Sequence, residues 1–304
     1  MSTTPNLTPP LIPDAELLAL GEGRHSGPHG VLGQHLLDPT DAVGDTAAPV
    51  VLRVRRPLAE SVTVILATSG ERVTLSHLAH GIWQGTHIHG LDDYQIATEY
   101  GDGVEHLEDD PYRFLPSIGD LDLFLIGEGR HERLWEVMGS HVREHWGTHE
   151  AVAGTSFTVW APHATAVRVV GSFNDWDGAK HAMRRLNEGG IWELFIPGVS
   201  AHATYKFQIL TAEGVWIDKA DPMARHTNEY EWNDSDWMNR RAATDPHNSP
   251  MSVYELHAMS WRPGLSYVEL ADELIEYLDQ TGFTHVEFMP LAEHPFGGSW
   301  GYQV

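Results

Sequence analysis

Apolar positions beyond residue 250 change their spacing twice, and this pattern predicts two strands with one helix between them. Residues 252–257 (SVYELH) and 284–289 (THVEFM) are short apolar runs of β type. Between them Leu270, Leu274 and Leu278 recur at the i, i+4 spacing of an amphipathic helix. The last part of the chain is therefore predicted to form a strand, a helix and a second strand.

Start and stop signals bound the predicted helix. Ser266 and Glu269 have the spacing of a capping box, and Gly282 is placed to end the helix in the left-handed conformation. Residues 252–289 then form one right-handed βαβ unit, the repeating element of parallel α/β folds. Because a (β/α)₈ barrel needs about 250 residues, we expect residues 246–304 to hold only its start, truncated.

An internal repeat precedes this unit, with an offset of 105 to 111 residues. Four stretches recur: VLRVRRP (51–57) as SFTVWAP (156–162), GIW (81–83) as GIW (190–192), YQI (94–96) as YKF (205–207), and DP (110–111) as DP (221–222). Each copy alternates short segments rich in Val, Ile, Thr and aromatic residues with Gly, Pro and Asp turns, as in a β-sandwich of about 100 residues. The repeat predicts two tandem immunoglobulin-like sandwiches.

The patterns together divide the chain into four segments. They are an N-terminal β-sandwich (1–118), a helical linker (119–150), a second β-sandwich (151–245) and the barrel start (246–304). The linker is predicted to be helical over LFLIGEGRHERLWEVMGSHVREHW, and the DPHNSP sequence at 245–250 is predicted to connect the second sandwich to the barrel.

The two copies differ at the loops where a ligand would be expected. In the second copy, one turn-rich loop presents Trp176 and another presents Trp216, whereas the loop at 67–72 in the first copy has no aromatic residue. A tryptophan in a sandwich belongs to the core by default, as we expect for Trp160. The turn residues beside Trp176 and Trp216 favour the surface for these two.

A neutral sugar is the ligand that such a surface suits. Sugars offer C–H faces and hydroxyl groups without charge, so proteins bind them with flat aromatic rings and a few polar groups. Trp176 and Trp216 with Lys206 provide that combination.

Composition and charge narrow the possible partners. The chain has 41% hydrophobic residues, enough for packed cores, and a formal charge of −24. That charge argues against nucleic acid and anionic membranes as partners. The N-terminus lacks a basic region followed by an apolar run, so we expect a cytoplasmic protein. There are no cysteines, which excludes disulfides.

Eight stretches carry a resemblance to a known family. They are GVLGQH (30–35), DDPYRF (109–114), TSFTVWAPHA (155–164), VVGSFNDWDG (169–178), GIWELFIPG (190–198), SVYELH (252–257), LSYVELADEL (265–274) and GFTHVEFMPLAEHPFGGSWGYQ (282–303). Through them the whole chain resembles the N-terminal part of bacterial 1,4-α-glucan (glycogen) branching enzymes, in the α-amylase superfamily. The HPFGGSWGYQ portion is the most specific.

This resemblance implies an activity and its location. Full-length relatives cut an α-1,4-glucan and transfer the cut piece to a C6 hydroxyl, using an Asp nucleophile and a Glu acid/base. Both carboxylates belong to later barrel strands, so we expect no catalytic residue within residues 1–304 and do not nominate Glu255, Glu287 or Glu293. The chain alone is expected to be inactive but able to bind α-glucan, either glycogen or a linear maltooligosaccharide.

The resemblance also assigns substrate-binding residues. Tyr302 matches the tyrosine that stacks on the sugar at the −1 subsite, and Trp176, Lys206 and Trp216 match the residues with which related glycogen-binding modules hold glucan. The family implies no cofactor and a monomeric full-length enzyme.

Histidines raise a metal hypothesis that we set aside. His141, His145 and His149 are spaced i, i+4, i+8 on the predicted linker helix, but no HExxH motif accompanies them. No metal site is expected.

Two alternative functions stay open. One is a relative in the same superfamily, either a debranching enzyme or a trehalose-releasing hydrolase of the maltooligosyltrehalose trehalohydrolase kind. The other is a non-catalytic glucan-binding protein. The HPFGGSWGYQ loop and the tandem sandwiches favour a branching enzyme.

Overall fold

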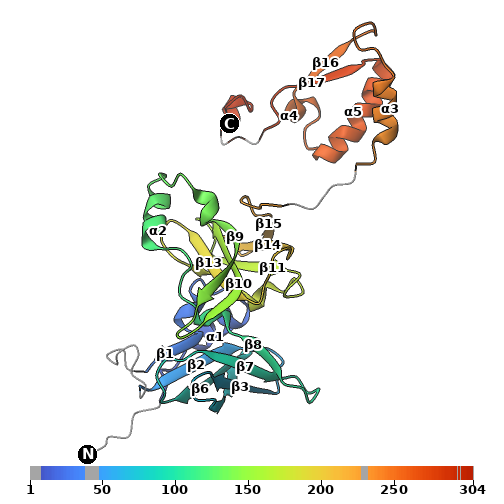
Figure 1. Cartoon of the computed structure of the whole chain (residues 1–304). Coiled ribbons are helices and arrows are strands. Elements are labelled where there is room, and N and C mark those ends of the chain that lie inside the picture. Colours follow the sequence, from blue (N-terminus) through green and yellow to red (C-terminus); the bar gives the residue numbers. More distant parts are fainter. Residues whose placement is uncertain (1–7, 38–47, 227–231, 293, 295, 304) are drawn as a thin grey trace, which may run out of the picture. The chain divides into compact units, whose positions relative to one another are not determined.

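The computed structural model describes residues 8–37, 48–226, 232–292, 294 and 296–303. The chain divides into two compact units, Met1–Thr227 and Asn228–Val304, and each is described by itself (Figure 1). The division lies upstream of the linker predicted at residues 245–250. The division into four predicted segments stays a prediction.

Two four-stranded antiparallel sheets form the first β-sandwich (Figure 1). One sheet has the order β1 (Gly33–Leu36), β2 (Val50–Arg55), β6 (Ile82–His87), β5 (Ser76–Ala79), and the other β4 (Arg72–Thr74), β3 (Ser61–Leu66), β7 (Tyr94–Glu99), β8 (His106–Asp109). Alternate side chains of both sheets, such as Leu52, Val54, Val62 and Val64, point inward and form a buried core.

The second β-sandwich has a four-stranded and a three-stranded antiparallel sheet. Their orders are β12 (Arg184–Arg185), β13 (Ile191–Pro197), β10 (Ala151–Trp160), β9 (Gly139–Trp146), and β11 (Ala166–Gly171), β14 (Tyr205–Leu210), β15 (Trp216–Lys219). Its core includes Phe157, Val169, Trp192 and Phe207.

Helix α1 (Asp14–Gly21) joins the two sandwiches. Its Leu17 and Leu20 are buried in the core of the second sandwich, together with Ile82 and Tyr112 from the first. Asp93 strengthens the junction by accepting hydrogen bonds from the backbone N–H groups of three residues in the β9–β10 turn, at 2.6 to 2.9 Å. The two sandwiches therefore share apolar and polar contacts within one unit.

Short helical segments complete the first unit. They are η1 (Pro28–Gly30), η2 (Pro111–Arg113), α2 (Asp120–Gly127), η3 (Leu134–Glu136) and η4 (Gly178–Lys180).

The internal repeat is confirmed down to single contacts. Gly81 and Gly190 both have positive φ, and each lies against a proline. A Cβ on Gly81 would lie 2.9 Å from the Cα of Pro57, and a Cβ on Gly190 would lie 2.2 Å from the Cα of Pro162. The indole N–H of Trp83 donates to the carbonyl of Arg56 at 2.9 Å, as that of Trp192 does to Ala161 at 3.0 Å. Tyr94 donates to Asp110, and Tyr205 likewise to Asp221.

The predicted helical stretch in the linker is wrong beyond its first part. Only α2 and the single turn η3 are helical, and residues 139–146 form strand β9, which pairs with β10 in antiparallel register. The i, i+4 spacing of His141 and His145 also places two side chains on one face of a strand, and pairing with β10 satisfies the backbone groups of both strands.

The expectation that Trp160 lies in the core is also wrong. Its side chain is 63% exposed at the end of β10, with the indole N–H donating to the carbonyl of Gly189 at 2.9 Å. Its neighbour Val159 faces the core instead, because successive strand residues point to opposite faces.

The second unit contains the predicted βαβ element. Strands β16 (Val253–Leu256) and β17 (His285–Phe288) pair in parallel, connected through α4 (Ala258–Trp261) and α5 (Tyr267–Thr281). Ser266 and Glu269 form the predicted capping box, and Gly282 ends α5 with φ +75°. Helices α3 (Ser235–Ala242) and η5 (Gly297–Ser299) flank the element.

Helix α5 packs on one face of this strand pair. Leu270 and Leu274 are buried against Leu256, with Tyr254 beside them. Glu255 and Glu287 are register partners on neighbouring strands, and both are exposed. Glu293 lies outside the described residues.

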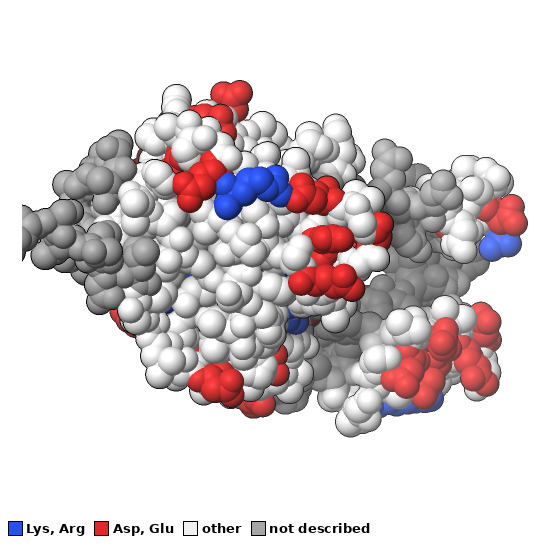
Figure 2. Space-filling model, turned by 90° about the horizontal axis from the view of Figure 1, so that it is seen from below, with Lys and Arg blue, Asp and Glu red and all other residues white. Residues whose placement is uncertain are grey.

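Carboxylates dominate the charged surface, as the formal charge of −24 requires. Figure 2 shows one face on which Asp and Glu side chains are spread widely while Lys and Arg are sparse. Among the described residues, no helix is both long and apolar enough to span a bilayer.

Candidate functional site

The outer face of the sheet β11–β14–β15 carries two of the predicted binding residues. Lys206 lies opposite Val170, and Trp216 lies opposite Leu210. Lys206 and Leu210 are four positions apart on β14, so both point to the same face. Phe207 points the other way and is fully buried in the core. The register thus places Lys206 and Trp216 on one surface of the second sandwich.

Arg168 fixes the ring of Trp216. The guanidinium carbon of Arg168 lies 3.7 Å from the centroid of the Trp216 ring, a cation–π contact. The same guanidinium donates to the side-chain oxygen of Gln208 at 2.9 Å and to the carbonyl of Glu22 at 3.0 Å. Gln208 in turn donates to Asp218 at 3.1 Å. The tryptophan is therefore half-buried and held from one side.

Trp176 lies in the turn after β11. The side chain of Asn174 stabilises this turn by accepting from the N–H of Gly171 and donating to the carbonyl of Val169, each at 2.9 Å. Trp176 has φ +61°, an uncommon conformation for a tryptophan, and its N–H donates to the carbonyl of Gly171 at 3.1 Å. Its side chain is 47% exposed, so the turn presents an aromatic ring to solvent.

The turn borders the outer face of the sheet. A Cβ at Gly178 would lie 2.8 Å from the side-chain oxygen of Gln208 and 3.0 Å from the Cβ of Arg168, so the backbone after Trp176 lies directly against these side chains. Lys206 is exposed and, among the described residues, has no carboxylate within 4 Å. The face thus offers two partly exposed indole rings, one free ammonium group and a chain of amide and carboxylate groups.

Sequence reasoning missed Arg168 and Gln208. Both lie between the predicted residues on the same face, and Arg168 pairs directly with Gln208 in the strand register. The signal was present in the repeat, because Arg168 corresponds to Thr63 in the first copy, so this strand position changes from a small polar residue to a long cation.

Tyr302 belongs to the second unit. Its side chain is 63% exposed, and its N–H donates to the carbonyl of Ser299 at 3.0 Å in the loop after η5. The ring of neighbouring Trp300 lies 5.1 Å from that of His257, at the end of β16. The loop is thereby held near the ends of the two parallel strands.

The three spaced histidines lie on no common helix. His141 and His145 are in strand β9, where their imidazoles contact the carbonyls of Met138 and Leu115 at 2.9 and 2.8 Å. His149 lies in the β9–β10 turn, 3.7 Å from a carboxylate oxygen of Asp92. In the described part of the chain, no three His, Cys, Asp or Glu side chains are grouped to hold a metal ion.

Two family models match the first unit. The model of the N-terminal domain of alpha-1,4-glucan branching enzyme GlgB matches residues 13–112, and that of carbohydrate-binding module 48 (isoamylase N-terminal domain) matches residues 137–224. The second match begins just before β9, in agreement with the strand that replaces the predicted helix.

Individual relatives cover almost the whole chain. The 1,4-alpha-glucan branching enzyme GlgB of Leifsonia xyli subsp. xyli is 55% identical over 97% of this chain and 41% of its own length. Over almost its whole length the chain is similar to the N-terminal portion of the branching-enzyme family. The enzymes so named from Rhodococcus jostii and Thermobifida fusca are 47% and 51% identical over 97% and 95% of the chain.

The chain spans about two fifths of the length of these curated relatives and corresponds to the N-terminal portion of the family. Among solved structures, type I pullulanase from Bacillus subtilis, complexed with maltose, aligns with 83% of the chain and 37% of its own length, at 14% identity and a TM-score of 0.23. That likeness is too low to support an argument.

Proposed function

We propose that the second sandwich is the glucan-binding module of a 1,4-α-glucan branching enzyme and binds α-glucan through Trp176, Lys206 and Trp216. The observation that carries this proposal is the shared outer face: the strand register places Lys206 and Trp216 on one surface, and the turn that presents Trp176 borders it. Partly exposed indole rings suit the C–H faces of glucose units, and the ammonium and amide groups suit the hydroxyls.

The whole protein, in this proposal, cuts an α-1,4-glucan and transfers the cut piece to a C6 hydroxyl to form an α-1,6 branch. Residues 246–304 are the start of its catalytic (β/α)₈ barrel. The parallel pair β16–β17, covered by α5, supports this assignment because a barrel repeats that arrangement. Tyr302, in the loop after the second strand, is proposed to stack on the sugar at the −1 subsite.

The proposed reaction retains configuration through an Asp nucleophile and a Glu acid/base on other barrel strands. Glu255 and Glu287 have no part in it. We further propose a cytoplasmic monomer that binds neither nucleic acid nor membranes, which the charge of −24 supports.

Glycogen co-sedimentation of the 304-residue chain tests the binding surface. The double change Trp176→Ala and Trp216→Ala is expected to weaken binding about tenfold, because two ring contacts are lost. Trp160→Ala is the matched control, since Trp160 is also exposed but belongs to the other sheet of the same sandwich, and it should bind as the unsubstituted chain does. Equal binding by the double variant and the control would refute the proposed surface.

A further inference from the structure

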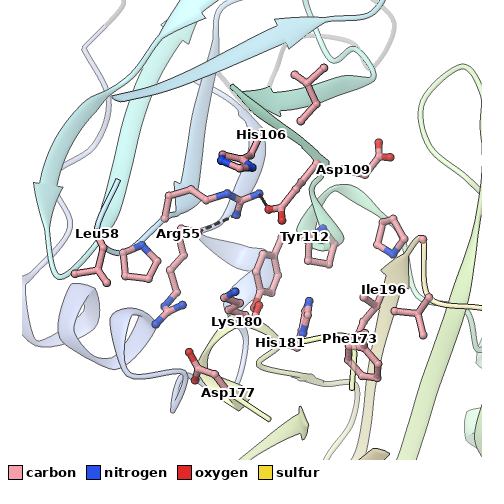
Figure 3. Close-up of a pocket in the computed structure, with 18 of the residues that line it drawn as sticks. Arg55, Leu58, His106, Asp109, Tyr112, Phe173, Asp177, Lys180, His181 and Ile196 are labelled. Atoms are coloured by element: carbon pink, nitrogen blue, oxygen red, sulfur yellow. Dashed lines mark hydrogen bonds and ion pairs between the residues drawn. The ribbon is translucent and has the colours of Figure 1, made fainter. Parts of the chain in front are cut away.

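A cavity of about 670 Å³ lies between the two sandwiches, and its lining does not include Trp176, Lys206 or Trp216. Figure 3 shows residues of both sandwiches around it: Arg55 and Tyr112 belong to the first, and Phe173, Lys180 and His181 to the second. Its volume lies within the usual range for small-molecule sites. The shared core around α1 holds the two sandwiches together at this point.

Three cations line this cavity in a chain that is strongly acidic. Arg56 is paired with Glu108 at 3.1 Å. Arg55 donates from Nε to the carbonyl of Gly21 at 2.9 Å, but one terminal nitrogen of its guanidinium is buried and has no hydrogen-bond partner among the described residues. Lys180 is exposed to the cavity mouth and has no carboxylate within 4 Å in the described part of the chain. Two of the three cations that line the cavity, Arg55 and Lys180, thus have no ion pair among the described residues.

The pKa of His181 reflects the positive charges around the cavity. Desolvation and then the charges of Lys180, Arg56 and Arg55 lower the pKa of its imidazole to about 3, against a weaker opposing effect of Asp177. His181 is therefore neutral at physiological pH, and its Nδ1 contacts the side-chain amide of Asn174 at 2.7 Å. A neutral imidazole adds no competing charge.

The remaining lining is mixed. Leu58, Phe173, Pro197 and Val199 supply apolar surface, and Asp177 supplies a carboxylate able to accept hydrogen bonds from hydroxyl groups. Leu58 is 92% exposed and has φ +65°, a strained conformation for a branched residue. Such strain is typical of residues that border ligand sites.

We propose that this cavity binds a phosphorylated sugar, with the phosphate between Arg55 and Lys180 and the sugar hydroxyls toward Asp177. Guanidinium groups bind phosphate oxygens through paired, charge-assisted hydrogen bonds, and a lysine adds a point charge. A neutral glucan would leave both cations without an anionic partner. The site thus differs in its lining residues and in its ligand chemistry from the proposed glucan-binding face.

Isothermal titration calorimetry of the 304-residue chain tests the proposal with glucose 6-phosphate, inorganic phosphate and glucose as separate titrants. One molecule of glucose 6-phosphate is expected to bind per chain, more tightly than inorganic phosphate and far more tightly than glucose. Lys180→Gln should weaken binding about tenfold, which is typical for the loss of one charge-assisted contact. Lys219→Gln, an equal charge change outside the cavity, should have no effect.

Arg55→Gln should weaken glucose 6-phosphate binding at least as much as Lys180→Gln does. If Arg55→Gln does not fold, Lys180→Gln alone still tests the proposal. The double change Trp176→Ala and Trp216→Ala should leave glucose 6-phosphate binding intact, which separates this site from the glucan-binding face. The proposal is overturned if glucose 6-phosphate does not bind, or if Lys180→Gln and Lys219→Gln weaken it equally. Equal affinity for inorganic phosphate would overturn the assignment of a sugar.

Discussion

The two sandwiches share a framework but differ on their outer faces. Both copies keep a glycine of positive φ against a proline and a tyrosine that donates to the aspartate of a DP pair. The strand registers show that Gln95 of the first copy corresponds to Lys206 of the second. The repeat offset of 111 residues at the DP pair makes Glu105 the counterpart of Trp216.

This difference separates structural residues from the proposed binding residues. Glu105 is ion-paired with Arg72, so the first copy has charged, solvated side chains where the second presents an indole ring. Both copies need the framework in order to fold, whereas we propose a ligand surface for the second copy only. The shared residues should therefore control stability, and those that differ should control binding.

The largest effect is expected at the shared glycines. Gly190→Ala should destabilise the chain by about 3 kcal/mol, because the new Cβ meets the backbone of Pro162 in addition to the positive-φ strain. Gly81→Ala should cost less, since its Cβ would lie 2.9 rather than 2.2 Å from the facing proline. Urea unfolding followed by tryptophan fluorescence measures both.

Gly198→Ala is the matched control for these glycine variants. Gly198 has φ +73°, but no atom lies within 4 Å of the added Cβ, so only the backbone strain remains, about 1 kcal/mol. If Gly190→Ala cost no more than Gly198→Ala, the shared glycine–proline contact would not be structural.

A second prediction concerns His181 in the second copy. Its backbone lies beside Val169, and the corresponding pair in the first copy is Val73 beside Val64. The pKa of His181 falls from 6.5 to about 3 on folding, so between these values the unfolded chain binds a proton that the folded chain does not. Stability should therefore fall as the pH drops from about 6.5 towards 3.

His181→Val should reduce the slope of stability against pH in that window, whatever its effect on stability at neutral pH. Chemical denaturation at several pH values measures the slope. An unchanged slope would mean that the imidazole is protonated as readily in the folded chain as in the unfolded one.

A smaller effect is expected at Lys206. Lys206→Ala should weaken glycogen binding about threefold, the loss of one net hydrogen bond to a sugar hydroxyl. Gln95→Ala, at the corresponding position of the first copy, should leave binding unchanged. Affinity electrophoresis in glycogen-containing gels compares the two, and equal retardation would contradict a role confined to the second copy.

The smallest effect is expected at Glu105. Glu105→Ala removes an exposed carboxylate whose ion pair contributes little to stability, so both stability and glycogen binding should stay close to those of the unsubstituted chain. A clear loss of binding would show that the first copy also contacts glucan.

Local signals in the sequence predicted much of this fold. The capping box at Ser266 and the positive φ of Gly282 followed from side-chain chemistry within a few residues. The repeat predicted two sandwiches because its glycines and DP pairs are required wherever that framework forms. The first kind of feature depends on neighbouring residues alone, and the second could be read because the same residues recur in both copies.

Features that depend on distant partners could not be predicted in the same way. Residues 139–146 become a strand because β10 is available to pair with them. Trp160 is exposed because of the face on which strand alternation places it. The contact of Arg168 with Trp216 and with the carbonyl of Glu22 unites three distant segments. The assignment of Trp176, Lys206, Trp216 and Tyr302 to sugar binding stays a prediction.

Hydrogen–deuterium exchange of the whole chain, with and without maltoheptaose, tests most directly whether the second sandwich alone binds glucan within the first unit. The account predicts slower exchange at residues 168–178 and 205–218, with no change at the corresponding residues 63–74 and 94–107 of the first copy. Protection in the first copy, or none in the second at a saturating concentration of ligand, would contradict it.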